Sequence, residues 1–183
     1  MKKEQLQSVD EVLEERKERL YRRKEFRRFI AECIVLVALV YAAFHYVIGL
    51  AVVSGSSMEP GLTDGEMVLF YRLDETYQRN DLVIIHRADG VEYIKRVVAE
   101  PGDVVELSEE GELLINGEKD TTPTAVGKTT PESEEIIYPY TVPADSYFVL
   151  GDNRENSKDS RSFGAVTADD VTGRVFVYVG MTR

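Results

Sequence analysis

Two adjacent serines, Ser56 and Ser57, stand in the stretch SGSSMEP at residues 54–60. A serine hydroxyl is a weak nucleophile until a neighbouring base removes its proton, so the first question is which base the chain supplies. The chain has two histidines, His45 and His86, and His45 lies within a long apolar run. A serine–histidine pair would therefore use His86, which ends the stretch LVIIH and is equally typical of a strand-edge residue.

A lysine offers a second route to a base. In the stretch EYIKRVVAEPGD, strand alternation places Tyr93, Lys95 and Val97 on one face. Apolar neighbours on that face would desolvate the ammonium and lower its pKa, as a general base requires. Bringing the pKa from about 10.4 to about 8 corresponds to about 3 kcal/mol of differential solvation. The segment alone also fits a surface lysine on an exposed strand.

A third stretch, GDNRENSKDSRSFG at residues 151–164, gathers Asp, Asn, Arg and Ser into one loop after an apolar strand. Buried charges must be paired and hydrogen-bonded, so this composition favours a braced region beside an active site over a solvated loop. We expect Asp159 and Arg161 to neutralise one another. An unpaired carboxylate near Lys95 would raise the pKa of the lysine and prevent it from acting as a base.

Composition limits the class of protein to which this chain can belong. Its 183 residues carry a formal net charge of −11, and residues 54–183 hold 12 Lys/Arg against 25 Asp/Glu. So acidic a body is a poor candidate for binding phosphate backbones, and we predict no nucleic-acid partner. The single cysteine, Cys33, excludes an intrachain disulfide, and with two histidines the chain offers no zinc cluster. We predict no metal and no cofactor.

The long apolar run, FIAECIVLVALVYAAFHYVIGLAVV, covers residues 29–53. As a helix of 25 residues it would measure about 37 Å, enough for a hydrocarbon core of about 30 Å. Its one formal charge, Glu32, lies four residues after Arg28, so the two can pair on one helix face. The run therefore predicts a transmembrane helix, and the alternative is a buried helix of a soluble protein.

Charges on either side of this run predict its orientation. The basic stretch YRRKEFRRF precedes it, and the first charged residue after it is Glu59. Because positive residues are retained on the cytoplasmic side, we place the N-terminus inside and the chain from about residue 54 outside. Small residues at Gly49 and Ala51 leave a cleaved secretory signal as the alternative, but the charged leader of 28 residues fits an uncleaved anchor better.

The rest of the chain has the pattern of a mostly β domain. Short apolar runs separated by Asp, Gly and Pro predict strands, and nothing suggests a strand–helix–strand alternation, so we expect an antiparallel sheet. The predicted strands cover residues 67–73, 81–87, 91–99, 103–107, 112–118, 146–151 and 173–180. The predicted parts are a cytoplasmic charged helical leader (1–28), the transmembrane helix (29–53), a catalytic β domain (54–107 and 143–183) and a small inserted cap with its own hairpin (108–142).

The stretches SGSSMEP, YIKRVVAEPGD and GDNRENSKDSRSFG occur in this order after one N-terminal span. Together they resemble bacterial type I signal peptidase, a family of membrane-anchored serine/lysine endopeptidases that remove signal peptides from exported preproteins. The resemblance covers residues 29 to about 180. The last stretch is the most specific, because all ten fixed positions of the pattern GDNR-x-NS-x-DSR-x-x-G are present.

The resemblance implies a role for each matching residue. The serine directly before the methionine corresponds to the nucleophile, which selects Ser57 over Ser56, and Lys95 corresponds to the general base. Ser157 corresponds to the hydroxyl that orients the lysine, and the Ser57 N–H to an oxyanion donor. Supporting roles fall to Asp152, Arg154, Asp159 and Arg161, and the residues expected around the oxyanion and the substrate are Val53, Gly55, Ser56, Met58, Tyr93 and Ile94.

The resemblance also implies the substrate: preproteins whose signal peptides carry small residues three and one positions before the cut, in the manner of Ala-x-Ala. Cleavage would pass through an acyl-enzyme at the outer face of the cytoplasmic membrane. An extended substrate would lie against strand edges near residues 52–55 and 93–94. Its partners would be signal peptides and the lipid bilayer, with the secretion machinery as a candidate.

Some positions depart from the family pattern. Gly55 stands two residues before the nucleophile, where some members carry a serine that donates to the oxyanion, so the second donor is left open between a neighbouring backbone N–H and Ser56. Gly61 replaces the usual threonine and Ala99 the usual glycine, and neither change touches the proposed chemistry.

Three other interpretations remain at this point. A self-cleaving repressor-type enzyme with the same serine and lysine would cut its own chain at Ala-Gly or Cys-Gly, and neither dipeptide occurs here. A dedicated processing peptidase of the same family would have few substrates. A non-catalytic membrane-anchored scaffold would be expected to have lost Ser57 or Lys95, and both are present.

Overall fold

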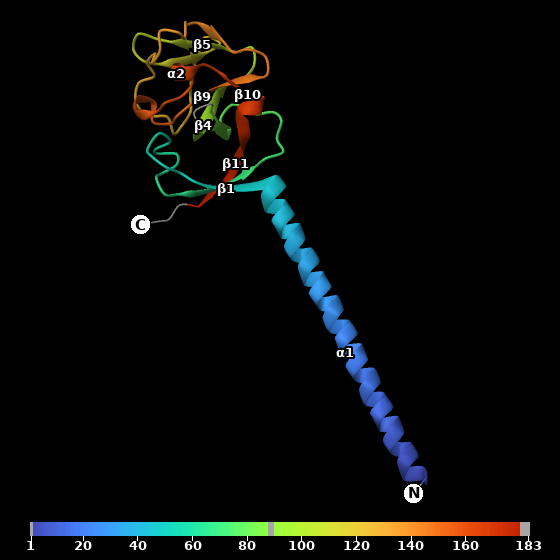
Figure 1. The fold of residues 1–183 in the computed structure, drawn as a ribbon. Coiled ribbons are helices and arrows are strands. Elements are labelled where there is room, and N and C mark those ends of the chain that lie inside the picture. The colour runs from blue at the N-terminus through green and yellow to red at the C-terminus, as the bar shows by residue number, and fades with distance from the viewer. Residues whose placement is uncertain (1, 88–89, 180–183) are drawn as a thin grey trace. The chain divides into compact units, whose positions relative to one another are not determined.

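The chain forms two units, Met1–His45 and Tyr46–Arg183, which are described one by one (Figure 1). The structure is a computed structural model that describes residues 2–87 and 90–179. Within the first helical turns, the side chains of residues 2–13, 15 and 18 lie outside that description.

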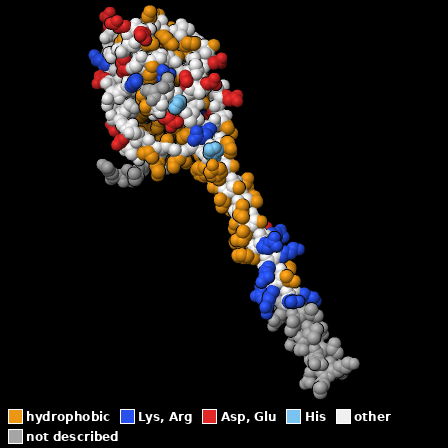
Figure 2. Space-filling view, in the orientation of Figure 1, with side chains coloured by type: hydrophobic (Ala, Val, Ile, Leu, Met, Phe, Trp, Pro, Cys, Tyr) orange, Lys and Arg blue, Asp and Glu red, His pale blue; other side chains and the backbone are white. Residues whose placement is uncertain are grey.

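The first unit is a single helix, α1, which runs from Lys2 to Ala42 and continues into a π-helical turn at Ala43–Val47. Within the described part of the chain, one helical stretch, Arg19–Val47, is long and apolar enough to span a membrane. Figure 2 shows basic side chains gathered on the helix before its apolar stretch. Arg28 donates to Glu32 across 3.0 Å, as their spacing predicts.

The end of the span differs from the sequence prediction. We expected the apolar run to remain helical to Val53, and this was wrong, because Ile48–Val52 forms strand β1. Gly49 shows the reason: its lack of a side chain admits a neighbouring ring, since a Cβ there would lie 2.0 Å from Phe70. Glycine also disfavours the helix interior. The helix from residue 29 to residue 47 still measures about 28 Å, close to the thickness of a hydrocarbon core.

The second unit contains a seven-stranded sheet in which every pairing is antiparallel, as predicted. Its order is β1-β2-β11-β3-β4-β9-β10. The prediction missed β1 and the two-residue strand β10, and residue 180 of the last predicted strand lies outside the described residues. The strands are β1 (Ile48–Val52), β2 (Met67–Tyr71), β3 (Leu82–His86), β4 (Glu92–Ala99), β9 (Ser146–Leu150), β10 (Val166–Thr167) and β11 (Val171–Val179).

A second, four-stranded sheet has the order β7-β6-β5-β8. It contains the small hairpin expected within residues 108–142, made by β6 and β7. It also includes β5, which we had expected in the main body, so the sheet begins before residue 108. Its strands are β5 (Val104–Leu107), β6 (Leu113–Ile115), β7 (Glu118–Lys119) and β8 (Tyr140–Thr141); the short helices of the unit are η2 (Arg154–Asn156), α2 (Ser160–Phe163) and η3 (Ala168–Asp170).

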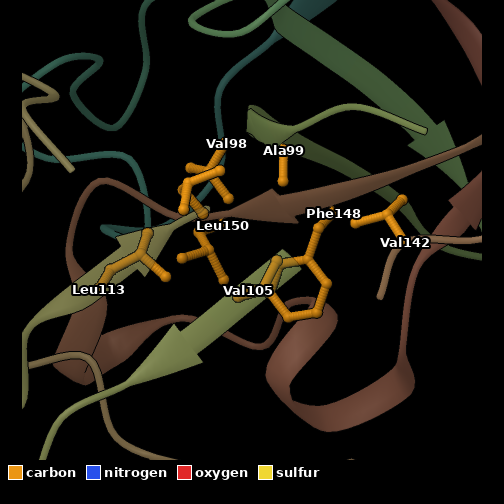
Figure 3. Packing of buried hydrophobic residues seen from close by; sticks show 8 residues of the cluster. Val98, Ala99, Val105, Leu113, Val142, Phe148 and Leu150 are labelled. Carbon is orange, nitrogen blue, oxygen red and sulfur yellow. The ribbon is translucent and has the colours of Figure 1, made fainter. Parts of the chain in front are cut away.

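An apolar cluster joins the two sheets (Figure 3). Phe148 and Leu150 of β9 pack there with Val105 of β5 and Leu113 of β6. Phe148, Leu150 and Val105 are completely buried. The small sheet therefore packs against β9, the strand that leads directly into the loop at residues 151–164.

Two further clusters lie on either side of β3, because successive side chains of a strand point to opposite faces. Val83 and Ile85 belong to one cluster, and Ile84 belongs to the other. The second of these clusters also contains Met58 and Leu62, which follow the candidate nucleophile in the chain. Burial of these two side chains anchors the turn that carries Ser57.

Candidate active site

The candidate nucleophile lies on a tight turn after β1. The Ser56 carbonyl accepts a hydrogen bond from Glu59 N at 3.1 Å, and the Met58 carbonyl accepts one from Leu62 N at 2.8 Å. Met58 is 1% exposed and Leu62 is fully buried. The chain on both sides of Ser57 is thus held by backbone bonds and by apolar packing, which fixes the direction of its side chain.

Lys95 lies on β4 opposite Val83 of β3 and is only 2% exposed. Its Nζ lies 2.7 Å from the Oγ of Ser57 and 5.7 Å from the centre of the Tyr93 ring. Val97, two residues further along the same face, is also buried. The predicted alternation on β4 is confirmed, and the surface-lysine interpretation is wrong.

Burial lowers the pKa of Lys95 from an ordinary 10.5 to about 8. Loss of hydration is the largest cause, because it penalises the charged ammonium. The nearby carboxylates of Asp159 and Asp152 act in the opposite direction, and the Arg161 guanidinium partly offsets them. With a pKa near 8, roughly a tenth of the lysine is neutral at pH 7, which is sufficient for a general base.

Asp159 and Arg161 form the ion pair expected from the sequence. Both Asp159 oxygens accept from the guanidinium, at 2.8 Å from Nε and 2.9 Å from Nη2, and both side chains are buried. Asp159 also caps α2 through Arg161 N and accepts from Gly151 N at 3.1 Å. One carboxylate therefore fixes the guanidinium, the start of α2 and the end of β9 together.

Asp152 and Arg154 brace the loop through partners that the sequence analysis missed. Asp152 binds Arg96, at 2.7 Å from Nε and 2.8 Å from Nη2. Arg154 donates to Asp120 at 2.9 Å and to Thr129 at 2.9 Å. The position of Arg96 directly after Lys95 was the available signal for the first pair, whereas nothing in the local sequence indicates the other two partners.

Two asparagines of the same loop hold the nucleophile turn and were also missed. The Asn153 N–H donates to the Ser57 carbonyl at 3.1 Å, and its side-chain amide donates to the Ser56 carbonyl at 3.2 Å. The Asn156 amide donates to the Ser56 hydroxyl at 2.7 Å. Their presence in the most specific stretch of the sequence was a signal to which we had attached no role.

Ser157 is buried beside the site. A Cβ placed on Gly151 would lie 2.2 Å from the Ser157 Oγ and 2.5 Å from the Ser57 carbonyl oxygen, so glycine permits this close approach. Within residues 2–87 and 90–179, the Ser157 hydroxyl has no hydrogen-bond partner. Its expected bond to Lys95 is therefore not formed in this structure, and its orienting role remains a prediction.

The expected oxyanion and substrate residues lie in the chain around Ser57 and on β4 just before Lys95. The Gly55 N–H donates to Asp64 at 2.8 Å, whereas no group of the described chain accepts from the Ser57 N–H. β9 pairs with β4 only from Arg96 onward, so Tyr93 and Ile94 lie where β4 has a described strand partner on one side alone.

The other edge expected to receive the substrate is β1, which is the outer strand of the sheet and is followed directly by the buried Val53. The alternative base, His86, is exposed and pairs with Glu92, three positions from the pair that contains Lys95. Among the described residues, no group of three or more His, Cys, Asp or Glu side chains could hold a metal ion.

Comparison with known proteins assigns the family. The model of the family "Signal peptidase, peptidase S26" matches residues 26–179. Signal peptidase IB of Staphylococcus aureus is 30% identical over 173 residues, which cover 84% of this chain and 88% of that protein. Signal peptidase I T of Bacillus subtilis is 35% identical over 153 residues, covering 76% and 78% respectively.

A crystal structure of a signal peptidase I from Enterococcus faecalis is 32% identical, with a TM-score of 0.47, and covers 55% of this chain and 97% of its own. The family match and the two curated relatives extend over most of the chain, and they confirm the resemblance carried by the three sequence stretches. The chain belongs to the signal peptidase family, peptidase S26, and has the activity of that family: it is a serine endopeptidase that cleaves signal peptides.

Proposed function

We propose that Ser57 is the nucleophile of this signal peptidase and that Lys95 is its general base. The observation that carries the proposal is the 2.7 Å contact between Lys95 Nζ and Ser57 Oγ, made by a lysine that is 2% exposed. A desolvated lysine next to a serine is the arrangement that activates a hydroxyl without a histidine. His86, at the exposed end of β3, is the weaker candidate.

The reaction follows from this pair. Neutral Lys95 takes the proton of the Ser57 hydroxyl as its Oγ attacks the carbonyl carbon at the cleavage site. The ammonium then gives that proton to the leaving amine, and an ester joins Ser57 to the signal peptide. A water molecule that loses its proton to Lys95 hydrolyses the ester and restores the serine. The Ser57 N–H stabilises the oxyanion in both steps.

The substrate binds in extended form. We infer that it pairs with the open side of β4 at Tyr93 and Ile94 and lies beside the chain after β1, at Val53 and Gly55, with Met58 beneath the site. Backbone bonds of this kind supply affinity without reading side chains, so specificity comes from the space available around the cut. We expect small residues three and one positions before it, in the manner of Ala-x-Ala.

The enzyme acts at the outer surface of the cytoplasmic membrane. The apolar helix anchors it as a single-pass protein, with the basic leader (residues 1–28) inside and the β domain outside. Exported preproteins emerge at that surface, which brings their signal peptides to the site. The lipid bilayer is thus a constant partner, and the secretion machinery is the partner that would deliver the substrate.

The test is cleavage of a preprotein whose signal peptide ends in Ala-x-Ala by the full chain in detergent. We expect wild type and Ser56→Ala to cut, and Ser57→Ala and Lys95→Ala to lose at least about a thousandfold in kcat/KM. Ser56→Ala is the matched control, since it removes the adjacent hydroxyl. Full activity of Lys95→Ala would refute the base, and a loss confined to Ser56→Ala would identify the other serine as the nucleophile.

A further inference from the structure

Residues 120–132 of the inserted region, here named the strap, contact the loop at residues 151–162 along its whole length. The sequence of this segment is poor in apolar residues, and its polar side chains and backbone make these contacts instead. Side-chain contacts join Asp120 and Arg154 at 2.9 Å, Thr124 and Asp152 at 2.7 Å, Thr129 and Arg154 at 2.9 Å, and Glu132 and Arg161 at 2.9 Å. In the backbone, the Val126 N–H donates to the Asp152 carbonyl at 2.8 Å and the Arg154 N–H donates to the Val126 carbonyl at 3.0 Å.

The contact between Glu132 and Arg161 adjoins the buried ion pair of Arg161 and Asp159. Glu132 binds the Arg161 guanidinium and also accepts a hydrogen bond from the Ser162 hydroxyl. Arg161 is 1% exposed and already holds Asp159 with two bonds. The same guanidinium donates to the Ser157 carbonyl at 3.3 Å. One buried cation is therefore shared between two carboxylates and fixed against the backbone of Ser157.

Glu132 adds a negative charge to a set of otherwise paired charges around Lys95. Asp159 is balanced by Arg161 and Asp152 by Arg96, while Arg154 is paired with Asp120 further out. Glu132 is the carboxylate in excess of these pairs. It acts against the burial that removes the proton from Lys95, and it raises the pKa of the lysine.

Other groups near this cluster do not alter the balance. Burial raises the pKa of Tyr138 to about 12, so that phenol stays neutral at working pH. On the other side, Lys158 lies 6.0 Å from the Tyr93 ring, which in turn lies 5.7 Å from Lys95 Nζ. Lys158 is exposed and positively charged, so it does not supply a negative charge near Lys95 as Glu132 does.

We propose that Glu132 is a positioning residue for catalysis. By sharing Arg161 with Asp159, it holds the guanidinium against the Ser157 carbonyl, and its negative charge makes it harder for Lys95 to lose its proton. This proposal rests on the assignment of Lys95 as the general base. The strap then has a function in the reaction as well as in folding, because the charge of one of its acidic side chains affects the protonation of Lys95.

The test is the pH dependence of kcat/KM for the full chain in detergent, with Glu132→Gln compared with wild type. Glutamine keeps the shape and carries no charge: its carbonyl oxygen can accept from Arg161, and its amide N–H can donate to the Ser162 hydroxyl. We expect the midpoint of the acidic limb to fall by about half a pH unit, which raises kcat/KM at pH 7 about threefold while the alkaline plateau changes less than about twofold. Glu134→Gln, from the same exposed segment, is the control and should leave the limb in place.

An unchanged limb in Glu132→Gln, or a lower plateau with no shift, would show that Glu132 only supports the fold and would overturn the proposal. Glu132→Ala removes the same charge by a different side chain and must move the limb in the same direction, which keeps the test decisive if the glutamine variant folds poorly. Lys95→Ala, assayed in parallel, distinguishes a failure of the base assignment from a failure of the role proposed for Glu132. If it retains activity, the base assignment fails together with the inference, whereas an inactive Lys95→Ala with an unmoved Glu132→Gln limb refutes the inference alone.

Discussion

The apolar cluster between the two sheets and the polar loop beside the nucleophile both bury side chains, but side chains of opposite kinds. The first consists of aliphatic and aromatic side chains such as Phe148 and Leu150. The second buries four charged side chains to 3% exposure or less, namely Asp152, Arg154, Asp159 and Arg161, and lies near Lys95 of β4, which is 2% exposed. The first contributes stability in proportion to the apolar area removed from water, whereas the second must first offset the cost of dehydrating each charge.

This difference shows where the fold and the chemistry are encoded. An apolar cluster needs only side chains of suitable size at alternating positions. The polar loop needs particular partners in particular places, because a buried charge without its partner is strongly destabilising. We infer that the ion pairs of the loop limit the uncompensated negative charge near Lys95.

The largest expected effect separates the two regions directly. Asp159→Asn leaves Arg161 buried with less compensation, and Phe148→Ala opens a cavity, so each should cost about 3–5 kcal/mol of unfolding free energy. Only Asp159→Asn should alter catalysis, because loss of this anion lowers the pKa of Lys95 and releases the end of β9. Thermal unfolding of both variants, with kcat/KM measured well below their midpoints, checks this.

The comparison would fail if Phe148→Ala moved the acidic limb of the pH profile as far as Asp159→Asn does. The polar loop would then be one more part of a uniform core. Asp169→Asn, which changes an acidic residue of η3, serves as the control for general charge effects and should behave as wild type.

The sequence predicted the fold well wherever structure depends on local pattern. Alternation of apolar residues predicted the longer strands, including β3 and β4, and their antiparallel arrangement. It failed for β1, because the apolar run at residues 48–52 satisfies the composition of a span as well as that of a strand. Only its pairing with β2, where Phe70 occupies the space beside Gly49, decides between the two.

For the site, the sequence predicted that Tyr93, Lys95 and Val97 share one face of β4 and that Asp159 pairs with Arg161, whereas the β4 segment alone left the burial of Lys95 open. The sequence could not predict that Asp120 and Glu132 complete the network, since these residues lie in a segment without periodicity and reach their partners only after the chain has folded. Such contacts depend on the long-range path of the chain. The contribution of this segment to the site was consequently the least visible in the sequence.

A smaller effect tests whether the site sacrifices stability for function. The pKa of Lys95 falls from an ordinary 10.5 to about 8 on folding. The unfolded chain therefore binds more protons between these values, and stability should rise with pH across that window and reach its full value above about 10.5. Below pH 8 the buried ammonium costs about 3 kcal/mol.

Lys95→Met, which replaces the ammonium by an apolar group of similar size, should remove that cost. At pH 7 we expect the variant to be inactive but more stable, with a thermal midpoint roughly 6–12 °C higher. At about pH 10.5 the difference from wild type should disappear, because the lysine is then neutral in both states. A variant that is less stable than wild type at pH 7 would mean that the lysine contributes to the fold rather than straining it.

If Lys95 takes the proton of Ser57, its burial must keep enough of the lysine neutral near pH 7 for it to act as a base. The most direct test of this claim is kcat/KM of the wild-type chain in detergent from pH 5.5 to pH 10, on a preprotein with an Ala-x-Ala signal. We predict one acidic limb with a midpoint near 8, as the pKa of the lysine requires. A limb near 6.5, in the ordinary range of a histidine, that His86→Ala abolishes would contradict the claim.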